Sequence, residues 1–265
     1  MMNLRITHLY PEEMNLYGDM GNVIALSRRA EARGIEVEIK NVKIGDELKS
    51  GETDIYFFGG GQDKQQAEIA LDLKNMKKDA LLKDLEAGVV CLAICGGYQL
   101  LGKYYLAGDG QRAEGVGFFP IETVAPGTNV KQRCIGNIST KIAHSKTNEE
   151  IRKYYTNSDA GKNLGTLVGF ENHAGRTKVL IEDKLQLGKV VSGIGDSENG
   201  GFEGLRYKNA FGSYMHGSFL PKNPHMADLL ISLAMKNRYG TKFGLLEALD
   251  DTIEWKAHES AINLK

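Results

Sequence analysis

The sequence has few of the features that mark secreted, disulfide-stabilised or membrane-embedded proteins. Only three cysteines occur among the 265 residues, Cys91, Cys95 and Cys134, and they form neither a paired framework nor a Cys-x-x-Cys metal or redox motif. No apolar run approaches the roughly 20 residues that a membrane span needs, and the first residues lack the basic and apolar regions of a signal peptide. We therefore expect a protein without a membrane span in the reducing cytoplasm.

A charge excess and the common nucleotide-binding motifs are also lacking. The 33 Lys and Arg residues are dispersed and nearly balance 34 Asp and Glu residues, for a net charge of −1, so the composition predicts no nucleic-acid partner. Gly-Lys-Ser, Gly-Lys-Thr and Gly-x-Gly-x-x-Gly are absent, and so is the Gly-x-Ser-x-Gly motif of serine hydrolases. We expect no metal and no cofactor in this chain, and no phosphate chemistry.

Strands that alternate with helices in the first 105 residues predict a parallel sheet, with ligands at the carboxyl ends of its strands. The expected elements are strands at 4–10, 35–40, 54–58 and 89–94, a helix from Tyr17 to about Arg33, and a helix capped by Asp63.

The second half predicts short strands joined by loops, and a helix that packs on the sheet. The strands are expected near 115–124, 134–142, 166–172, 189–192 and 209–215, and the helix from Pro224 to Tyr239. We expect one domain over 1–265, with its core at about 4–240, a polar surface insert at about 145–162 and a charged C-terminal appendage at about 241–265.

The most informative segment is the apolar run from Val89 to Ile94, which leads directly into Cys95 and two glycines. This pattern is typical of a nucleophile elbow, in which a strand-to-helix turn exposes the side chain and the helix N-terminus stabilises a thiolate. The alternative is a buried structural cysteine, which is the interpretation we favour for Cys91.

A nucleophilic cysteine needs a base, and His216 is the best placed of six histidines because it follows the expected strand 209–215. His173 is the competitor, since it also lies at a strand end beside glycine. The other histidines are expected to be packing or surface residues. The oxyanion of the tetrahedral intermediate needs backbone N–H donors, and the sequence offers the amide of Gly96 and the turn 59–61, although three glycines also suit a tight loop.

Five motifs follow one another in a fixed order along the chain. They are Asn15 to Asn22, Phe58 to Asp63, Ile94 to Gly102, Gly169 to His173 with Gly175-Arg176-Thr177, and Tyr207-Lys208-Asn209 with His216-Gly217. Together they resemble the cobyric-acid-synthase-like (CobB/CobQ-type) branch of the class I glutamine amidotransferases, and within it the glutaminase subunits, called GatD, of lipid II isoglutaminyl synthase. The resemblance implies a flavodoxin-like three-layer α/β sandwich with a central, mostly parallel sheet flanked by helices.

The resemblance also implies roles for individual residues. Cys95 resembles the nucleophile and His216 the general base and acid, whereas the backbone amides of Gly60 and Gly96 resemble the oxyanion donors. Gln99 resembles a residue that contacts glutamine, and Arg133 is implied for the α-carboxylate because its guanidinium can bind bidentately. A solvated surface arginine is the alternative for Arg133. Further candidates for substrate contacts are Arg176, Glu171 and Asn172.

For these relatives the resemblance implies a heterodimer with a Mur-ligase-like subunit, MurT. That partner carries ATP and Mg²⁺ and uses ammonia to amidate the D-glutamate of membrane-bound lipid II, while the present chain hydrolyses L-glutamine. Three alternatives stay open: an amidotransferase for another synthetase, such as one acting on corrinoid carboxylates; a cysteine hydrolase acting on γ-glutamyl bonds; and a binding module without catalysis.

One departure from the commoner class I pattern concerns the partner of the histidine. Ser218 stands two residues after His216, where many amidotransferases have a glutamate. The sequence therefore predicts a Cys–His dyad or a carboxylate supplied by the partner subunit, with Glu171 as the internal alternative.

Overall fold

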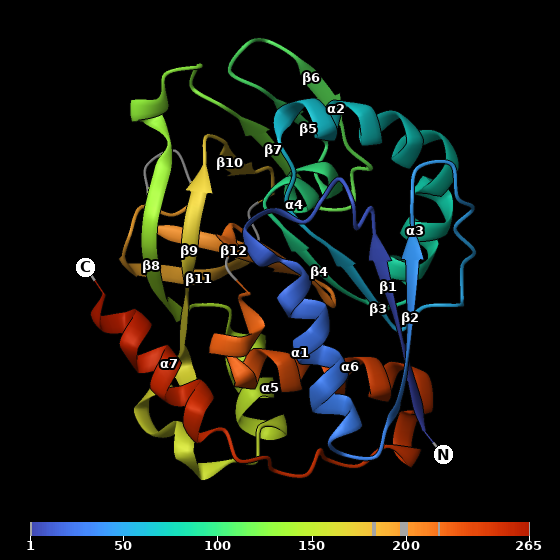
Figure 1. The fold of residues 1–265 in the computed structure, drawn as a ribbon, viewed down its shortest axis with the longest axis vertical. Helices are drawn as coiled ribbons and strands as arrows, with labels where there is room; N and C mark the ends of the chain where they lie inside the picture. Colours follow the sequence, from blue (N-terminus) through green and yellow to red (C-terminus); the bar gives the residue numbers. More distant parts are fainter. Residues whose placement is uncertain (1, 182–183, 197–200, 217, 265) are drawn as a thin grey trace.

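The computed structural model describes residues 2–181, 184–196, 201–216 and 218–264. Its strands are β1 (Asn3–Leu9), β2 (Glu36–Val42), β3 (Ile55–Phe58), β4 (Val90–Ile94), β5 (Tyr104–Leu106), β6 (Arg112–Glu114), β7 (Ile121–Val124), β8 (Cys134–Ile142), β9 (Thr166–His173), β10 (Arg176–Val179), β11 (Gln186–Ser192), β12 (Phe202–Tyr207), β13 (Ala210–Ser213) and β14 (Met215–His216). Its helices are α1 (Met20–Glu31), α2 (Asp63–Asp72), α3 (Lys78–Glu86), α4 (Gly96–Leu101), α5 (Ser145–Tyr154), α6 (Pro224–Tyr239) and α7 (Thr252–Asn263) (Figure 1).

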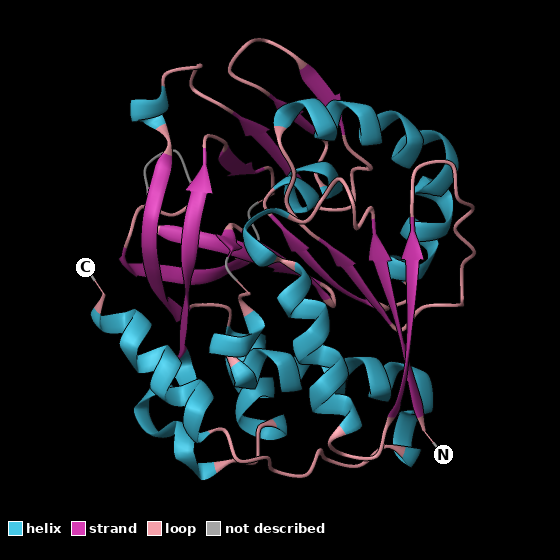
Figure 2. Cartoon of the chain, viewed as in Figure 1, coloured by secondary structure: helices cyan, strands magenta, loops and turns pink. Residues whose placement is uncertain are grey.

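The strands form a ten-stranded sheet and a small four-stranded sheet (Figure 2). The large sheet has the order β14-β9-β8-β11-β12-β13-β4-β3-β1-β2, and the small one β10-β7-β5-β6. Neighbouring strands from β13 to β2 pair in parallel, whereas those from β14 to β13 pair antiparallel. The α/β class expected from the sequence is confirmed, and its parallel half is the one that carries the alternating strands and helices.

Helices cover both faces of the parallel half of the sheet, because successive strand–helix–strand connections run toward opposite edges of the sheet. From the neighbouring pair β1 and β3, helix α1 leads outward to β2, whereas α2 and α3 lead the other way to β4. Right-handed crossovers that run in opposite directions place their helices on opposite faces. Helix α6, expected from the sequence at these same residues, contacts α1 (Figure 1). The boundary between β1 and β3 is thus the switch point at which α/β sheets bind ligands.

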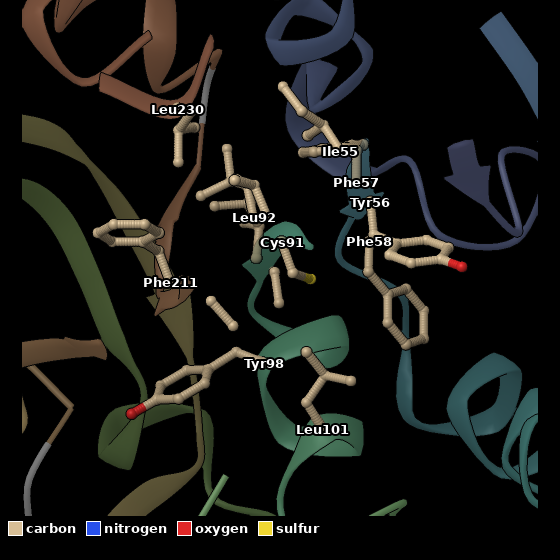
Figure 3. Packing of buried hydrophobic residues seen from close by; sticks show 14 of the residues in the cluster. Ile55, Tyr56, Phe57, Phe58, Cys91, Leu92, Tyr98, Leu101, Phe211 and Leu230 are labelled. Atoms are coloured by element: carbon tan, nitrogen blue, oxygen red, sulfur yellow. The ribbon is translucent and has the colours of Figure 1, made fainter. Parts of the chain in front are cut away.

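The core lies where the parallel strands meet these helices. Figure 3 shows Phe57, Leu92, Tyr98, Phe211 and Leu230 among the side chains packed there. Cys91 is fully buried in the same cluster, as expected for a structural cysteine. Within the described ranges, no helix combines the length and apolar character needed to cross a membrane.

Segments outside the alternating pattern also pack onto the domain. The 145–162 insert contains α5, whose Ile151 and Tyr154 are buried, and the 241–265 segment contains α7, whose Trp255 and His258 are buried. The expected cap of α2 is wrong: Asp63 is the first residue of α2, and Gln62 caps it through a reciprocal capping box with Gln65. The strand expected near 115–124 is shorter than predicted, since β7 begins at Ile121.

His8, the last residue but one of β1, is expected to make the stability of the protein depend on pH. It is fully buried against Phe57, and in the described part of the chain neither ring nitrogen has a hydrogen-bond partner. Burial lowers the pKa of His8 to about 4. Between the unfolded pKa of about 6.5 and that value, only the unfolded chain binds the proton, so stability falls as the pH falls.

We expect His8→Leu to reduce the loss of unfolding free energy between pH 7.5 and pH 5 by roughly 2 kcal/mol. Urea unfolding of both proteins at the two pH values measures this difference. An identical pH dependence in wild type and variant would show that His8 does not contribute.

Candidate active site

Cys95 occupies a strained turn between β4 and α4. Its backbone has φ 50° and ψ −104°, a left-handed conformation that is uncommon for a residue with a side chain and that typically marks functional sites. A Cβ at Gly97 would lie 2.4 Å from the carbonyl oxygen of Phe58 in β3, so the turn needs glycine there. The Cys95 amide donates to the Ser213 carbonyl over 2.8 Å. These contacts fix an elbow whose side chain lines a cavity of about 610 Å³.

His216 ends β14 and lines the same cavity. Its side chain is fully buried, and Nε2 makes no hydrogen bond to the described residues. A Cβ added to Gly60 would lie 2.5 Å from His216 Cε1 and 3.2 Å from Cys95 Cβ, so the two side chains meet over this glycine. The structure therefore brings the expected nucleophile and base together; Gly217, the next residue of that motif, lies outside the described residues.

The other ring nitrogen of His216 contacts a carboxylate of this same chain. Both oxygens of Asp19 lie 3.2 Å from His216 Nδ1, and Asp19 is fully buried. The sequence predicts a Cys–His dyad or a carboxylate from the partner subunit, with Glu171 as the internal alternative; instead, a different carboxylate of this chain, Asp19, contacts His216. Asp19 precedes α1 in a loop after β1, 197 positions from His216. The sequence signal that could have found it is the motif Asn15 to Asn22.

The electrostatic surroundings of His216 favour its protonated form. Burial alone lowers the pKa of this imidazole, but the interaction with Cys95 and the hydrogen bond to Asp19 outweigh burial and raise the pKa to about 10. At neutral pH His216 is therefore an imidazolium beside Cys95. A neighbouring imidazolium is one of the features that favour the thiolate form of a cysteine, which is its nucleophilic form.

The two predicted oxyanion donors differ in their present partners. Gly96 is the first residue of α4, and its amide belongs to the helix turn whose N–H groups lack intrahelical acceptors. The Gly60 amide instead donates to Asp19 Oδ2 over 2.8 Å. Gly60 is therefore engaged in this structure, and the neighbouring Gly61 lines the cavity.

The polar side chains that line the cavity include Arg133 and Gln99. Arg133 binds Asn172 through Nε and Nη2, with the shortest contact 2.9 Å from Nη2 to Oδ1. Gln99 is buried, donates to the Tyr214 hydroxyl over 3.0 Å, and keeps Oε1 without a partner among the described residues. The alternative arginine, Arg176, donates to backbone carbonyls and is not among the residues that line the cavity.

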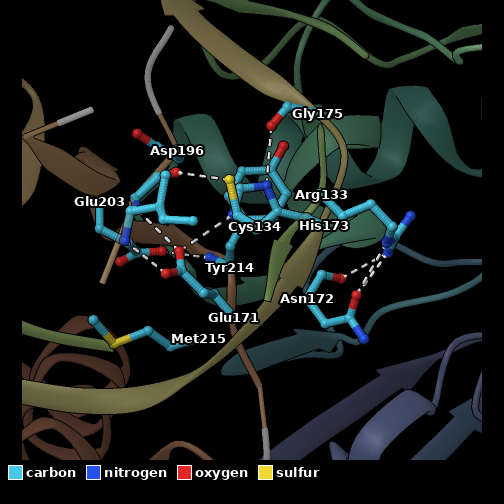
Figure 4. A network of polar contacts seen from close by, with 12 residues as sticks. Arg133, Cys134, Glu171, Asn172, His173, Gly175, Asp196, Glu203, Tyr214 and Met215 are labelled. Carbon is cyan, nitrogen blue, oxygen red and sulfur yellow. Dashed lines mark hydrogen bonds and ion pairs between the residues drawn. The ribbon is translucent and has the colours of Figure 1, made fainter. Parts of the chain in front are cut away.

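Glu171 and His173 belong to a buried polar network (Figure 4), and His173 also lines the cavity. Glu171 accepts hydrogen bonds from the amides of Ile194 and Gly195 over 2.7 and 2.9 Å, so it does not serve His216. His173 lies with Nδ1 3.0 Å from the carbonyl oxygen of Gly175, and burial lowers its pKa. This environment favours a neutral, structural histidine rather than the base.

Residues of the same network could also hold a metal ion. Cys134, Glu171 and His173 place sulfur, oxygen and nitrogen atoms within 4.8 Å of one another. The Cys134 thiol donates to the Gly195 carbonyl at 3.8 Å, and both oxygens of Glu171 accept backbone amides. Two of the three groups, Cys134 and Glu171, thus have hydrogen-bond partners in the protein itself and need no metal ion to satisfy them.

Comparison with known proteins adds an independent result. A model of the CobB/CobQ-like glutamine amidotransferase domain matches residues 5–224. The chain belongs to this family. The GatD subunit of lipid II isoglutaminyl synthase (glutamine-hydrolyzing) from Streptococcus pneumoniae is 40% identical, and the match covers 99% of this chain and 92% of the relative. The subunit of the same name from Staphylococcus aureus is 37% identical, with 99% and 96% covered.

The fold of this amidotransferase is shared with distant solved structures. The structure of PurLQS from Thermotoga maritima superposes with a TM-score of 0.56 and covers 89% of this chain and 99% of that chain, at 14% sequence identity. At this identity the likeness shows the fold alone. It agrees with the three-layer α/β architecture.

The three cysteines of the amidotransferase should react at very different rates. Cys95 lines the cavity beside an imidazolium, whereas Cys91 and Cys134 are fully buried and burial raises the pKa of both thiols. Brief iodoacetamide treatment of the folded protein should therefore modify Cys95 first. Peptide mapping by mass spectrometry measures this, and equal labelling of all three cysteines would argue against a thiolate at Cys95.

Proposed function

We propose that this amidotransferase hydrolyses L-glutamine through Cys95 and His216 and supplies ammonia to an ATP-dependent, Mur-ligase-like partner of the MurT type. The partner would amidate the D-glutamate of lipid II to D-isoglutamine in peptidoglycan synthesis. The observation that carries the hydrolytic half is the strained Cys95 beside a buried, protonated His216 in a cavity. The similarity to two GatD subunits along almost their full length supports the acceptor.

The first half of the reaction forms a thioester. The Cys95 thiolate attacks the side-chain amide carbon of glutamine, and the carbonyl electrons move onto oxygen. The amide of Gly96 donates to this oxyanion from the helix N-terminus. When the carbon–nitrogen bond breaks, His216 Nε2 gives its proton to the leaving nitrogen, so that ammonia departs and a glutamyl thioester remains.

The second half restores the enzyme. Neutral His216 takes a proton from a water molecule, and the resulting hydroxide attacks the thioester carbon. The carbon–sulfur bond breaks, glutamate leaves, and the thiolate again faces an imidazolium. The unpartnered Nε2 of His216 is the atom that carries the proton in both halves.

Substrate capture is proposed for Arg133 and Gln99. The guanidinium of Arg133 can bind the α-carboxylate of glutamine, and Gln99 offers a buried amide oxygen without a partner in the described chain. Asn172 orients Arg133 through its side chain and its carbonyl.

Arg133→Ala should raise KM for glutamine about 30-fold or more, because truncating one member of a buried charge pair weakens binding by roughly 2 kcal/mol or more. Steady-state kinetics measure the effect, and Lys131→Ala, an exposed neighbour, is the matched control that should leave KM unchanged. An unchanged KM in Arg133→Ala together with a raised KM in Arg176→Ala would move the assignment to Arg176.

The acceptor half of the reaction requires the partner. Amidating a carboxylate needs its prior activation, usually by phosphorylation, and the sequence of this chain contains no nucleotide-binding motif of the common types. We therefore place ATP and Mg²⁺ on the partner of a heterodimer. The chain itself would work in the cytoplasm, where glutamine and ATP are available.

The test combines the chain with a MurT-type partner, ATP, lipid II and glutamine labelled with nitrogen-15 in its side-chain amide. We expect labelled D-isoglutamine in the stem peptide by mass spectrometry, and none when the partner, ATP or glutamine is left out. Hydrolysis of glutamine without any transfer to lipid II would exclude this acceptor and favour another synthetase. Release of γ-glutamyl groups from peptides, without amidation, would favour the γ-glutamyl hydrolase.

A further inference from the structure

We propose that Asp19 is the positioning carboxylate of the catalytic histidine, so that this chain carries a complete Cys95–His216–Asp19 triad. The proposal rests on the glutaminase role of Cys95 and His216 given above. Asp19 acts through His216 Nδ1, which both of its oxygens approach at 3.2 Å. It would hold the ring in the orientation that presents Nε2 to the thiol and stabilise the imidazolium.

The segment that carries Asp19, residues 16–19, is hydrogen-bonded to two other loops of the site. The amide of Leu16 donates to the Gly60 carbonyl over 3.1 Å, and the amide of Gly60 donates back to Asp19 Oδ2 over 2.8 Å. On the other side, the Ser218 hydroxyl donates to the Gly18 carbonyl over 2.9 Å. The carboxylate is therefore held between the loop after β3 and the loop after β14.

Two further contacts bring this segment against the histidine. The Tyr17 ring meets the His216 ring edge-on with centroids 5.0 Å apart. A Cβ at Gly21 would lie 2.1 Å from the Ser218 hydroxyl oxygen, so glycine is needed for this close approach. Ser218 occupies the position, two residues after the histidine, where many class I amidotransferases have a glutamate. Here its hydroxyl instead binds the backbone of Gly18, which precedes the carboxylate of Asp19.

The charged groups around His216 support this assignment. Cys95, Asp19 and Tyr17 are the titratable residues that face its ring in the described chain. Glu171 belongs to the adjacent strand β9, but its oxygens accept the amides of Ile194 and Gly195. Within the chain, the carboxylate that can stabilise a charged His216 is thus Asp19.

The test compares Asp19→Asn with Glu171→Gln, which removes a buried carboxylate of the neighbouring strand. The first readout is the pH dependence of Cys95 alkylation by iodoacetamide in the isolated full-length chain. The acidic limb of this curve reports where the Cys95 thiol gives way to the reactive thiolate. Asp19→Asn should move this limb upward by about one pH unit or more, because it removes a charge that favours the imidazolium, and the imidazolium in turn stabilises the thiolate. Glu171→Gln should leave the limb in place.

The second readout is glutamine hydrolysis in the complex with the partner. Asp19→Asn should lower kcat by roughly 10²-fold to 10⁴-fold, the range of general acid–base catalysis, with KM nearly unchanged. Ser218→Ala, which loosens the segment but keeps the carboxylate, should lower kcat far less and leave the acidic limb in place.

The proposal is overturned if Asp19→Asn is folded by circular dichroism and has a wild-type acidic limb, or if Glu171→Gln moves the limb instead. A wild-type kcat of Asp19→Asn in the complex would assign the positioning role to a carboxylate of the partner. Failure of the wild-type complex to hydrolyse glutamine would contradict the proposed function, while the alkylation curves would still decide whether Asp19 charges His216.

Discussion

Cys95→Ser should abolish glutamine hydrolysis, with a loss in kcat of about 10⁴-fold to 10⁶-fold, the scale seen when a nucleophile is removed from an enzyme. The substitution keeps the size of the side chain and the strained turn, so the fold should remain. A hydroxyl, however, is a far weaker acid than a thiol, so the His216 imidazolium cannot hold it in the charged, nucleophilic form. Ammonia release measured with and without the partner gives the loss in rate.

The control for this experiment is Cys134→Ser, which makes the same atomic change at a buried cysteine behind the cavity. It should retain kcat within a few-fold, and both variants should unfold near the temperature of the wild-type protein. Substantial hydrolysis by Cys95→Ser, or a larger loss in Cys134→Ser, would be incompatible with Cys95 as the nucleophile.

Arg29→Met should lower the free energy of unfolding by about 3 to 5 kcal/mol, the effect of breaking a buried ion pair from one side. Arg29 in α1 binds Asp228 in α6 over 2.7 and 2.9 Å, and Asp251 before α7 over 2.6 and 3.0 Å. Removal of the guanidinium leaves Asp251 with the Tyr155 hydroxyl as its buried partner. Arg33 still contacts Asp228, so the larger loss falls on the attachment of α7.

The matched control is Arg28→Met on the same helix turn, where an exposed arginine pairs with Glu31 over 3.0 Å. A surface pair contributes about 0 to 1 kcal/mol. In urea unfolding, Arg29→Met should therefore have a clearly lower midpoint than Arg28→Met, with a similar dependence of the unfolding free energy on urea concentration. Equal midpoints would show that the buried network does not hold the C-terminal helix.

The sequence predicts local structure well where the spacing of apolar residues and the turn or cap residues at the ends of a segment indicate the same element. Strands β1 to β4 and helix α6 lie close to their expected positions, because apolar runs and helical stripes there report on burial directly. The strained turn at Cys95 follows from a buried strand that leads into two glycines. The cap of α2 differs from the prediction because the side chains of Gln62 and Gln65 each accept a hydrogen bond from the other residue's backbone N–H. The sequence predicts Asp63 instead because aspartate is a common N-cap residue.

The missed features depend on pairings between distant segments. The motif Asn15 to Asn22 includes Asp19 but does not say which residue the carboxylate contacts, and its contact with His216 appears only when β1 and β14 are placed in one domain. The engagement of the Gly60 amide follows from the same contact. The packing of Trp255 in the C-terminal segment likewise needs Tyr155, whose hydroxyl accepts from its indole N–H over 2.8 Å.

The separation of 197 positions between Asp19 and His216 has a consequence for synthesis on the ribosome. A contact between such distant residues forms only after the second of them has left the ribosome, and closing so long a loop is also entropically unfavourable. A nascent chain that has not yet released β14 carries Cys95 without its base. Under the mechanism proposed above, unfinished copies of this chain therefore cannot hydrolyse glutamine, and Cys95 becomes an active nucleophile only after the whole domain has folded.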